Sequence, residues 1–453
     1  MKIKNFPSLN GYAIIASMRA WNRVWLVGIV LWLAACGAAK STSQPPAAAT
    51  FIETPTPSIP VSTALSPTPP SPTRTASLIS DAPITLTLWV PEDFAPGAER
   101  GGDVLASQIA AFESEHPNIQ LNYVLKASYG KGGIVDWLTQ IHELMPERLP
   151  DAAIVDSREL DVLDAQELLK PLNRDLPSGT YWDLFSPAQT IAKRQGKWLD
   201  QPLVLETEHL VYDSHRVPVP PTTWDEVLGD KTGFAFAADS TDTFLFHYLE
   251  SGSALSATQQ PTQNTSVTQS ILDYYQRARA NGILNETTAG LQSARDVLPL
   301  FLNGQTPMAQ VRVRDYLVER ARLPNAVAAA IPTRDGRATA LVSGWSFVMF
   351  TADEARQRAV LNYLEWLSAP DHLGEWASAA KMIPASKSAF AQAIEPQAYA
   401  DLLWSLLQSG IVAPSFQEQA PYADAWHAAV QAVLNGQLSP EDAAFRAVQA
   451  ITQ

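Results

Sequence analysis

A single cysteine and seven scattered histidines leave the 453-residue chain short of the side chains that most metal and redox sites need. Without a second thiol no intrachain disulfide can form, so stability must come from a core, for which 46% hydrophobic residues suffice. The histidines lack the spacing of zinc ligands, and the run YGKGG at 129–133 lacks the Walker spacing. We therefore expect no metal and no cofactor.

Positive charge is also scarce. The formal net charge is −14, and residues 1–40 contain five cations and no acid, so the remaining chain carries about −19. Phosphate backbones and anionic lipid surfaces repel a protein of this charge. We therefore expect no nucleic-acid partner.

The apolar run VWLVGIVLWLAA at residues 24–35 is shorter than the roughly 20 residues that a membrane-spanning helix needs. Four cations and no acid precede it, which is the layout of an export signal. Leu33-Ala34-Ala35-Cys36 resembles the bacterial lipoprotein signal, in which the cysteine is acylated and becomes the new N-terminus. This predicts a signal peptide over 1–35, counted from Met1 or from Met18, and a lipid anchor on Cys36. The alternative is an inert, buried cysteine in an uncleaved helix.

A change of composition separates this signal from the rest of the chain. Residues 41–80 contain nine prolines and sixteen serines or threonines, with only two charged residues. Such a segment cannot bury enough apolar surface to offset the entropy of ordering. With the lipidated Cys36 it forms a predicted tether over 36–80, whose reach is at most about 120 Å at polyproline pitch. An anchored tether would place the protein outside the cytoplasm, on the outer face of the cell membrane or in the periplasm.

Beyond the tether, strand and helix patterns alternate. Residues 84–90, 119–125 and 152–155 have the pattern of strands, whereas 104–113 and 134–145 have apolar residues at helical spacing. This alternation indicates an α/β fold with helices on both faces of a sheet. Farther along, PPTTWDEV predicts a helix that begins at Trp224 with a capping box between Thr223 and Glu226.

Acids follow two of the predicted strands. Ligands in open α/β sheets bind beyond the carboxyl ends of the strands, which makes Glu92, Asp93 and Asp156 candidates for ligand contact. The alternative for each is an ordinary solvated acid in a loop.

A series of phrases then points to a family. In chain order they are ITLTLWV, FESEHPNIQL, LPDAAIVDS, ETEHLVYDS, PPTTWDEV, GQTPMAQVRVRDY, AAAIPTRDG, LVSGWSFVMF, ARQRAVLNYLEWL and KMIPASKSAF. Together with the lipoprotein signal and the tether, they resemble the extracytoplasmic solute-binding proteins of ATP-driven importers, in the group that includes maltose- and other sugar-binding members. The similarity covers roughly residues 82–453.

The resemblance implies a two-lobed α/β periplasmic-binding-protein fold of type II, with the lobes joined by a multi-strand hinge and the ligand held between them. The first lobe would comprise 82–205 plus 328–367, and the second 206–327 plus 368–453. Ligand can drive closure only if it binds the closed state better than the open one.

The family also implies the ligand contacts. Sugar sites combine flat aromatics with polar groups at the edges of the ring, and Trp345, after Gly344, matches a position that commonly lines the family's cleft. The expected contacts are Trp345, Tyr316, Arg312, Arg314, Glu92, Asp156, Glu206, Tyr422 and Trp426. Each aromatic could instead pack in the core.

Two arginines depart from the family pattern, in which a glycine and an aromatic are common. Because arginine is suited to a bidentate grip on carboxylate or phosphate, Arg312 and Arg314 leave an acidic sugar or a phosphorylated polyol open beside a neutral sugar.

The predicted function is the substrate-binding component of an importer: a monomer, not an enzyme, that captures a small solute, with a carbohydrate favoured, and delivers it to a membrane permease. One alternative is a surface-anchored glycoside hydrolase that uses Glu92 and Asp156 as its carboxylate pair. Another is a lipoprotein of the same fold that passes ligand occupancy to a membrane receptor.

Overall fold

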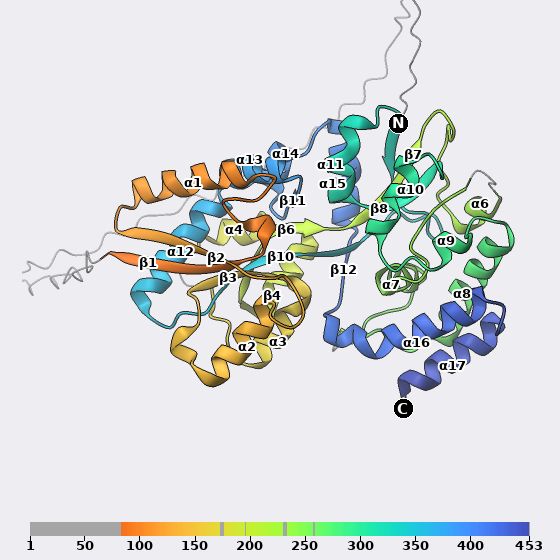
Figure 1. Ribbon diagram of the computed structural model, residues 1–453, viewed down its shortest axis with the longest axis horizontal. Helices are drawn as coiled ribbons and strands as arrows, with labels where there is room; N and C mark the ends of the chain where they lie inside the picture. Colours follow the sequence, from red (N-terminus) through yellow and green to blue (C-terminus); the bar gives the residue numbers. More distant parts are fainter. Residues whose placement is uncertain (1–82, 173–175, 195, 230–232, 257–258, 453) are drawn as a thin grey trace, which may run out of the picture. The chain divides into compact units, whose positions relative to one another are not determined.

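The computed structural model describes residues 83–172, 176–194, 196–229, 233–256 and 259–452 (Figure 1). All of them belong to Leu78–Gln453, the second of two units into which the chain divides. The predicted signal peptide, Cys36 and the tether lie outside these residues. Among the helices that the structure describes, none is both long enough and apolar enough to cross a membrane.

A large mixed sheet has the strand order β11-β6-β10-β3-β1-β2, with β12 paired to β10. Its strands are β1 (Ile84–Val90), β2 (Ile119–Leu125), β3 (Ala152–Asp156), β6 (Asp200–Glu206), β10 (Leu341–Met349), β11 (Ile383–Pro384) and β12 (Ile411–Val412). Parallel pairing joins β1 to β2 and β3, whereas β10 runs antiparallel to both β3 and β6. Antiparallel pairing of β10 with β3 sets Trp345 opposite Asp156.

A smaller antiparallel sheet has the order β8-β7-β9. These strands are β7 (Glu208–Asp213), β8 (Met308–Arg312) and β9 (Ala326–Ala329). Glu208 lies opposite Arg312 in this ladder, and Leu210 lies opposite Gln310. A short hairpin, β4 (Lys193–Arg194) with β5 (Lys197–Trp198), stands apart from both sheets.

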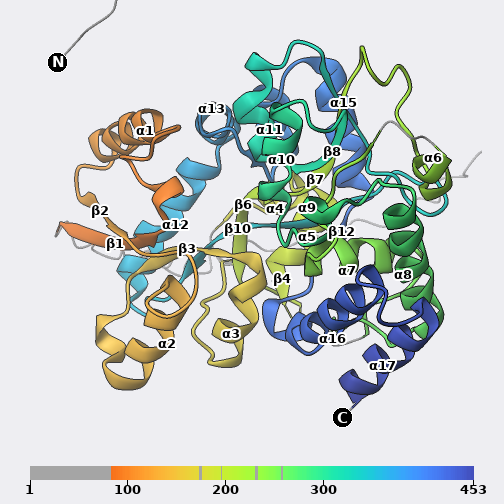
Figure 2. The same ribbon diagram turned by 45° about the vertical axis from the view of Figure 1, so that its right-hand side comes forward.

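Helices surround both sheets. The α-helices are α1 (Gly102–Glu115), α2 (Ile134–Leu144), α3 (Leu160–Ala165), α4 (Ser178–Trp182), α5 (Ser186–Ala192), α6 (Trp224–Gly229), α7 (Thr241–Glu250), α8 (Thr265–Ala280), α9 (Glu286–Ala289), α10 (Leu298–Leu302), α11 (Val313–Glu319), α12 (Glu354–Ser368), α13 (Pro370–Ala380), α14 (Lys387–Ala393), α15 (Gln397–Gln408), α16 (Phe416–Leu434) and α17 (Pro440–Thr452). Short 3₁₀ helices are η1 (Glu92–Phe94), η2 (Pro146–Arg148), η3 (Ser157–Glu159), η4 (Ala294–Asp296) and η5 (Arg320–Arg322). Figures 1 and 2 show α1 and α13 on one side of the large sheet and α2 and α3 on the other.

Buried apolar side chains form two clusters, and the first of them continues from the large sheet into β7, β8 and α11 of the second lobe. One fills the large sheet and its helices and includes Leu86, Phe112 and Phe347. The other surrounds the contacts among α8, α16 and α17 and includes Phe236 and Tyr275.

The chain passes between the lobes at three places. Thr207 alone separates β6 from β7, residues 330–340 lead from β9 back to β10, and residues 413–415 lead from β12 to α16. The prediction of a two-lobed α/β fold joined by strand crossovers is confirmed.

The predicted strands and helices of the first lobe are confirmed within a few residues at each end. The capping box is confirmed too: Glu226 N donates to Thr223 Oγ1 at 3.1 Å, and Thr223 N donates to Glu226 Oε2 at 3.2 Å. Because α13 and α14 pack together beside β11, residues 370–393 lie with the large sheet. The predicted boundaries gave this segment to the second lobe, and the lobe boundaries stay a prediction.

Asp200 is a fully buried acid in β6 whose nearest cation, Arg194 Nε, is 4.0 Å away. Burial raises the pKa of Asp200 from 3.8 to about 7. Between these two pH values the folded chain holds more protons than the unfolded chain, so stability falls as pH rises, and the loss is complete above pH 7. Asp200→Asn is therefore expected to increase the free energy of unfolding by a few kcal/mol at pH 8 and to have little effect at pH 4.

Urea unfolding at both pH values measures this difference. Asp424→Asn, which changes an exposed acid on α16, is the matched control and should change stability by less than about 0.5 kcal/mol. A stability gain for Asp200→Asn that is the same at pH 4 and pH 8 would contradict the assignment of the penalty to charge burial.

Candidate functional site

A cavity of about 360 Å³ opens where the two sheets meet. Its volume is within the range of about 300–1,000 Å³ that is usual for small-molecule sites. The large-sheet side contributes Asp93, Ser128, Tyr129, Arg158 and Trp345. The crossover strands contribute Glu206, Thr207, Glu208, Leu341 and Ser343, and the second lobe contributes Ser240, Asp242, Phe246, Gln292, Arg295, Gln310 and Phe416. Arg312 and Arg314 complete the wall beside β8.

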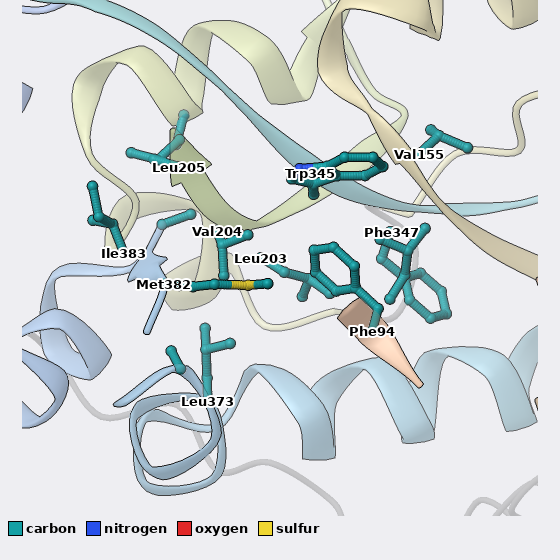
Figure 3. Close-up of a cluster of buried hydrophobic side chains, with 14 of the residues drawn as sticks. Phe94, Val155, Leu203, Val204, Leu205, Trp345, Phe347, Leu373, Met382 and Ile383 are labelled. Carbon is teal, nitrogen blue, oxygen red and sulfur yellow. The ribbon is translucent and has the colours of Figure 1, made fainter. Parts of the chain in front are cut away.

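Trp345 forms the aromatic part of the large-sheet wall. Its ring lies 5.3 Å from Phe94 and 5.8 Å from Tyr129, centroid to centroid. Figure 3 shows Trp345 next to Phe94 within a cluster of buried apolar side chains. Only 8% of Trp345 is exposed, and its Nε1 donates to Glu206 Oε1 at 3.4 Å. Phe94 and Glu206 therefore hold the ring in place, while part of it faces the cavity.

Asp156 holds two residues of this wall in position. It ends β3 and caps η3 by accepting a hydrogen bond from Arg158 N at 2.8 Å. Its other oxygen accepts from the Tyr129 hydroxyl at 2.5 Å. With 1% exposure, Asp156 lies beneath the cavity surface and orients Tyr129 and Arg158 instead of lining the cavity itself.

Arg158 connects the two lobes across the cavity. Its Nη1 donates to Asp242 of α7 at 3.0 Å, and its guanidinium lies 4.1 Å from the ring of Phe416 at the start of α16. Ser240 caps α7 by accepting from Thr243 N, which fixes Asp242 in the first turn. Tyr129 also meets Phe416, edge to face, at 5.9 Å.

Two more arginines bind carboxylates at the cavity wall. Arg312 Nη2 donates to Glu206 Oε1 at 3.3 Å, and Arg314 Nη1 donates to Asp93 at 2.6 Å. The hydrogen bond from Arg314 is the largest cause that lowers the pKa of Asp93. Both arginines are therefore neutralised by acids of the protein.

Glu208 begins β7 on the cavity wall, and its partner there is an amide. Gln310 Nε2 donates to Glu208 Oε2 at 2.6 Å. Residues two apart on a strand share a face, so Gln310 and Arg312 of β8 both point toward the cavity. Burial raises the pKa of Glu208 from 4.5 to about 7.

The structure brings four of the predicted contact residues together around the cavity: Trp345, Glu206, Arg312 and Arg314. Asp156 supports the wall from below, and Glu92 is an exposed neighbour of the lining residue Asp93. Tyr316 packs against His209 and Tyr399 and does not line the cavity. Tyr422 and Trp426 lie in the core of the second lobe, 7% and 2% exposed.

Several lining residues were missed in the sequence. Tyr129 belongs to the run YGKGG, which indicates only a turn, and Arg158, Asp242 and Phe416 have no motif around them. Glu208 could have been found, since it follows the predicted contact Glu206 by two residues in the phrase ETEHLVYDS. Within the described ranges, no cluster of acids, histidines or cysteines could hold a metal ion.

Comparisons with known proteins agree with this architecture. Residues 107–403 match the family model of the bacterial extracellular solute-binding proteins. No curated protein sequence matches the chain. Among solved structures, the cyclic alpha-maltosyl-1,6-maltose binding protein of Arthrobacter globiformis is 21% identical and covers 82% of this chain and 98% of its own, with a TM-score of 0.65.

Two further structures have the same fold. Maltose-bound MalE3 of T. maritima is 16% identical over 81% of this chain and 99% of its own, with a TM-score of 0.63. The maltose-maltodextrin binding protein of Alicyclobacillus acidocaldarius is 17% identical over 82% of this chain and 100% of its own, also with a TM-score of 0.63.

Proposed function

Because this chain belongs to the family of bacterial extracellular solute-binding proteins, we propose that it captures a carbohydrate between its two lobes and delivers it to the membrane permease of an ATP-driven importer. The observation that carries this proposal is the cavity at the lobe junction, where Trp345 and Tyr129 provide aromatic surface and acids and arginines surround it. Apolar sugar faces pack on aromatic rings, and hydroxyls exchange hydrogen bonds with such charged groups.

The ion pairs of Arg312 and Arg314 favour a sugar over an anion beside these two residues. Arg312 and Arg314, which suggested an acidic sugar or a phosphorylated polyol, are bound to Glu206 and Asp93. A ligand carboxylate or phosphate would have to displace these acids or lie beside them. Hydroxyls can instead join the existing pairs, since each hydroxyl both donates and accepts. The solved structures of the same fold named above bind cyclic alpha-maltosyl-1,6-maltose, maltose, or maltose and maltodextrin, which supports the same ligand class.

Closure of the lobes on the ligand follows from the connections. The two lobes comprise 82–205 with 328–367 and 206–327 with 368–453, and helices α13 and α14 of the last range pack beside β11 of the large sheet. The three crossovers act as the hinge, and ligand favours closure by contacting both walls. Arg158 and Phe416 already meet across the cavity.

We propose that the ligand is bound without chemical change. A retaining or inverting glycosidase needs two carboxyl groups that flank the scissile bond. Asp156 is 1% exposed and bound to Tyr129 and Arg158, which disfavours that role. The importer role requires an extracytoplasmic location, which the family supports, and we propose Cys36 as the lipid anchor that keeps the protein beside its permease.

A thermal titration with a carbohydrate panel tests this function. A true ligand should raise the melting temperature in proportion to the logarithm of its concentration, and should be recovered unchanged. Cleaved product would favour the hydrolase. If no carbohydrate shifts the melting temperature while an amino acid, peptide or polyamine does, the carbohydrate assignment is wrong even though the family stands.

A further inference from the structure

Glu208 differs from the other acids that line the cavity, because each of the others forms an ion pair with an arginine. Asp93 is bound to Arg314, Glu206 to Arg312, and Asp242 to Arg158. Glu208 is the one lining acid for which the described residues supply no ion pair, and its hydrogen-bond donor is the neutral amide of Gln310.

The surroundings of Glu208 make its charge costly. Burial is the main cause of its raised pKa, and Asp242, facing it from α7, adds repulsion. Three groups oppose this rise: the Gln310 amide and Arg312, both from β8, and Arg158 from η3. Both arginines are already engaged by other carboxylates. A half-buried carboxylate in this position is stabilised by a positive partner, and the described residues do not supply one.

A second acceptor lies beside it without a donor. Gln310 is 1% exposed, and its Oε1 has no hydrogen-bond partner among the described residues. Buried amide oxygens are nearly always bonded. Glu208 therefore lines the cavity as a carboxylate without an ion pair, and the unbonded oxygen of Gln310 lies buried beside it.

A protonated amine supplies what this pair lacks. An ammonium group has three donors, no acceptor and one positive charge, whereas a hydroxyl brings a donor but no charge. We propose that Glu208 and Gln310 form a subsite for a protonated amine of the ligand, so that the carbohydrate captured is an amino sugar. This inference rests on the proposed function and narrows its ligand.

Three disaccharides that share ring and linkage test the subsite. Chitobiose has free amines, N,N′-diacetylchitobiose has acetamides, and cellobiose has hydroxyls at the same carbon. Calorimetry with the purified protein at pH 7.5 should show an affinity for chitobiose at least tenfold higher than that for either of the other two disaccharides. Glu208→Gln should remove this preference while keeping the shape of the side chain.

A matched variant controls for loss of a buried acid elsewhere. Glu250 of α7 does not line the cavity, and burial raises its pKa to about 7 as well. Glu250→Gln should therefore leave the preference for chitobiose unchanged.

The pH dependence gives a second measurement. As pH falls below about 7, Glu208 of the free protein gains a proton that an ammonium ligand must displace. Where the amine of chitobiose is already fully protonated, its affinity should fall by up to about tenfold per pH unit as long as Glu208 stays ionised in the complex, and Glu208→Gln should lose this fall.

Three results would overturn the inference. If the subsite exists, chitobiose binds more tightly than cellobiose and diacetylchitobiose. Equal affinity for chitobiose and either of the other two refutes the subsite. Retention of the preference in Glu208→Gln also refutes it. If none of the three disaccharides binds, the amine subsite is refuted, and the proposed function fails as well only if the wider carbohydrate panel gives no binding either.

Discussion

Trp345→Ala is expected to weaken carbohydrate binding by at least about 30-fold, which corresponds to about 2 kcal/mol, the threshold of an interface hot spot. The ring is the aromatic side chain that β10 contributes to the cavity wall, and it also positions Glu206 through its Nε1. Because Trp345 packs on Phe94 in the core, the same change should cost about 3–5 kcal/mol of folding stability. Calorimetric titration and urea unfolding measure the two effects separately.

Trp376→Ala is the matched control for the stability effect. Trp376 packs on the same Phe94 at 5.5 Å and is 2% exposed, but it does not line the cavity. It should lose a similar amount of stability and keep its affinity for ligand. If Trp345→Ala bound ligand with full affinity, or if both variants lost affinity equally, the sugar would not stack on Trp345.

Arg158→Ala is expected to cost about 3–5 kcal/mol of stability and to open the ligand-free protein. Removal of the guanidinium leaves Asp156 buried without its cation, and breaking a buried ion pair on one side is costly in this range. It also removes the contacts with Asp242 and Phe416 that join the lobes. Urea unfolding should show the first effect, and a larger radius of gyration in X-ray scattering should show the second.

Asp242→Asn separates these two roles. It removes the ionic partner across the cavity but leaves Arg158 beside Asp156. Stability should change by no more than about 1 kcal/mol, since Asp242 is partly exposed, while the scattering curve should shift in the same direction as for Arg158→Ala. An unchanged scattering curve in both variants would mean that Arg158 does not hold the lobes together.

The sequence predicted the fold well where local patterns decide the structure. Alternation in ITLTLWV and helical spacing around Leu105, Ile109 and Phe112 are local properties, and both elements form where they were expected. The capping box at Thr223 is local as well. Lobe membership is different, because the contact of α13 with α1 depends on chain segments about 260 residues apart.

The site was predicted only in part, for a physical reason. Trp345 matches a position that commonly lines the family's cleft, Glu206 was expected as a polar group at the rim, and both line the cavity. Tyr422 and Trp426 were expected as contacts, yet they are four residues apart on one face of α16, together with Ala425 and Ala429. That spacing is the pattern of a buried helix face, and the two rings pack in the core.

Contacts between lobes could not be predicted from local pattern. Arg158 meets Asp242 and Phe416, which are 84 and 258 positions away in the chain, only because the fold sets η3 against α7 and α16. The unpaired state of Glu208 likewise depends on which acids the arginines of the cavity bind. Such pairings are set by tertiary structure, so a list of charged residues cannot give them.

Mass spectrometry of the small molecules released by denaturing the protein, purified from its own host, measures the captured ligand directly. We expect an intact carbohydrate, at up to one molecule per chain and carrying a free amine. A sugar without an amine would be consistent with capture between the lobes but would contradict the amine subsite at Glu208. Release of an amino acid, a peptide or a cleaved sugar would contradict the account of a protein that binds a carbohydrate and delivers it unchanged.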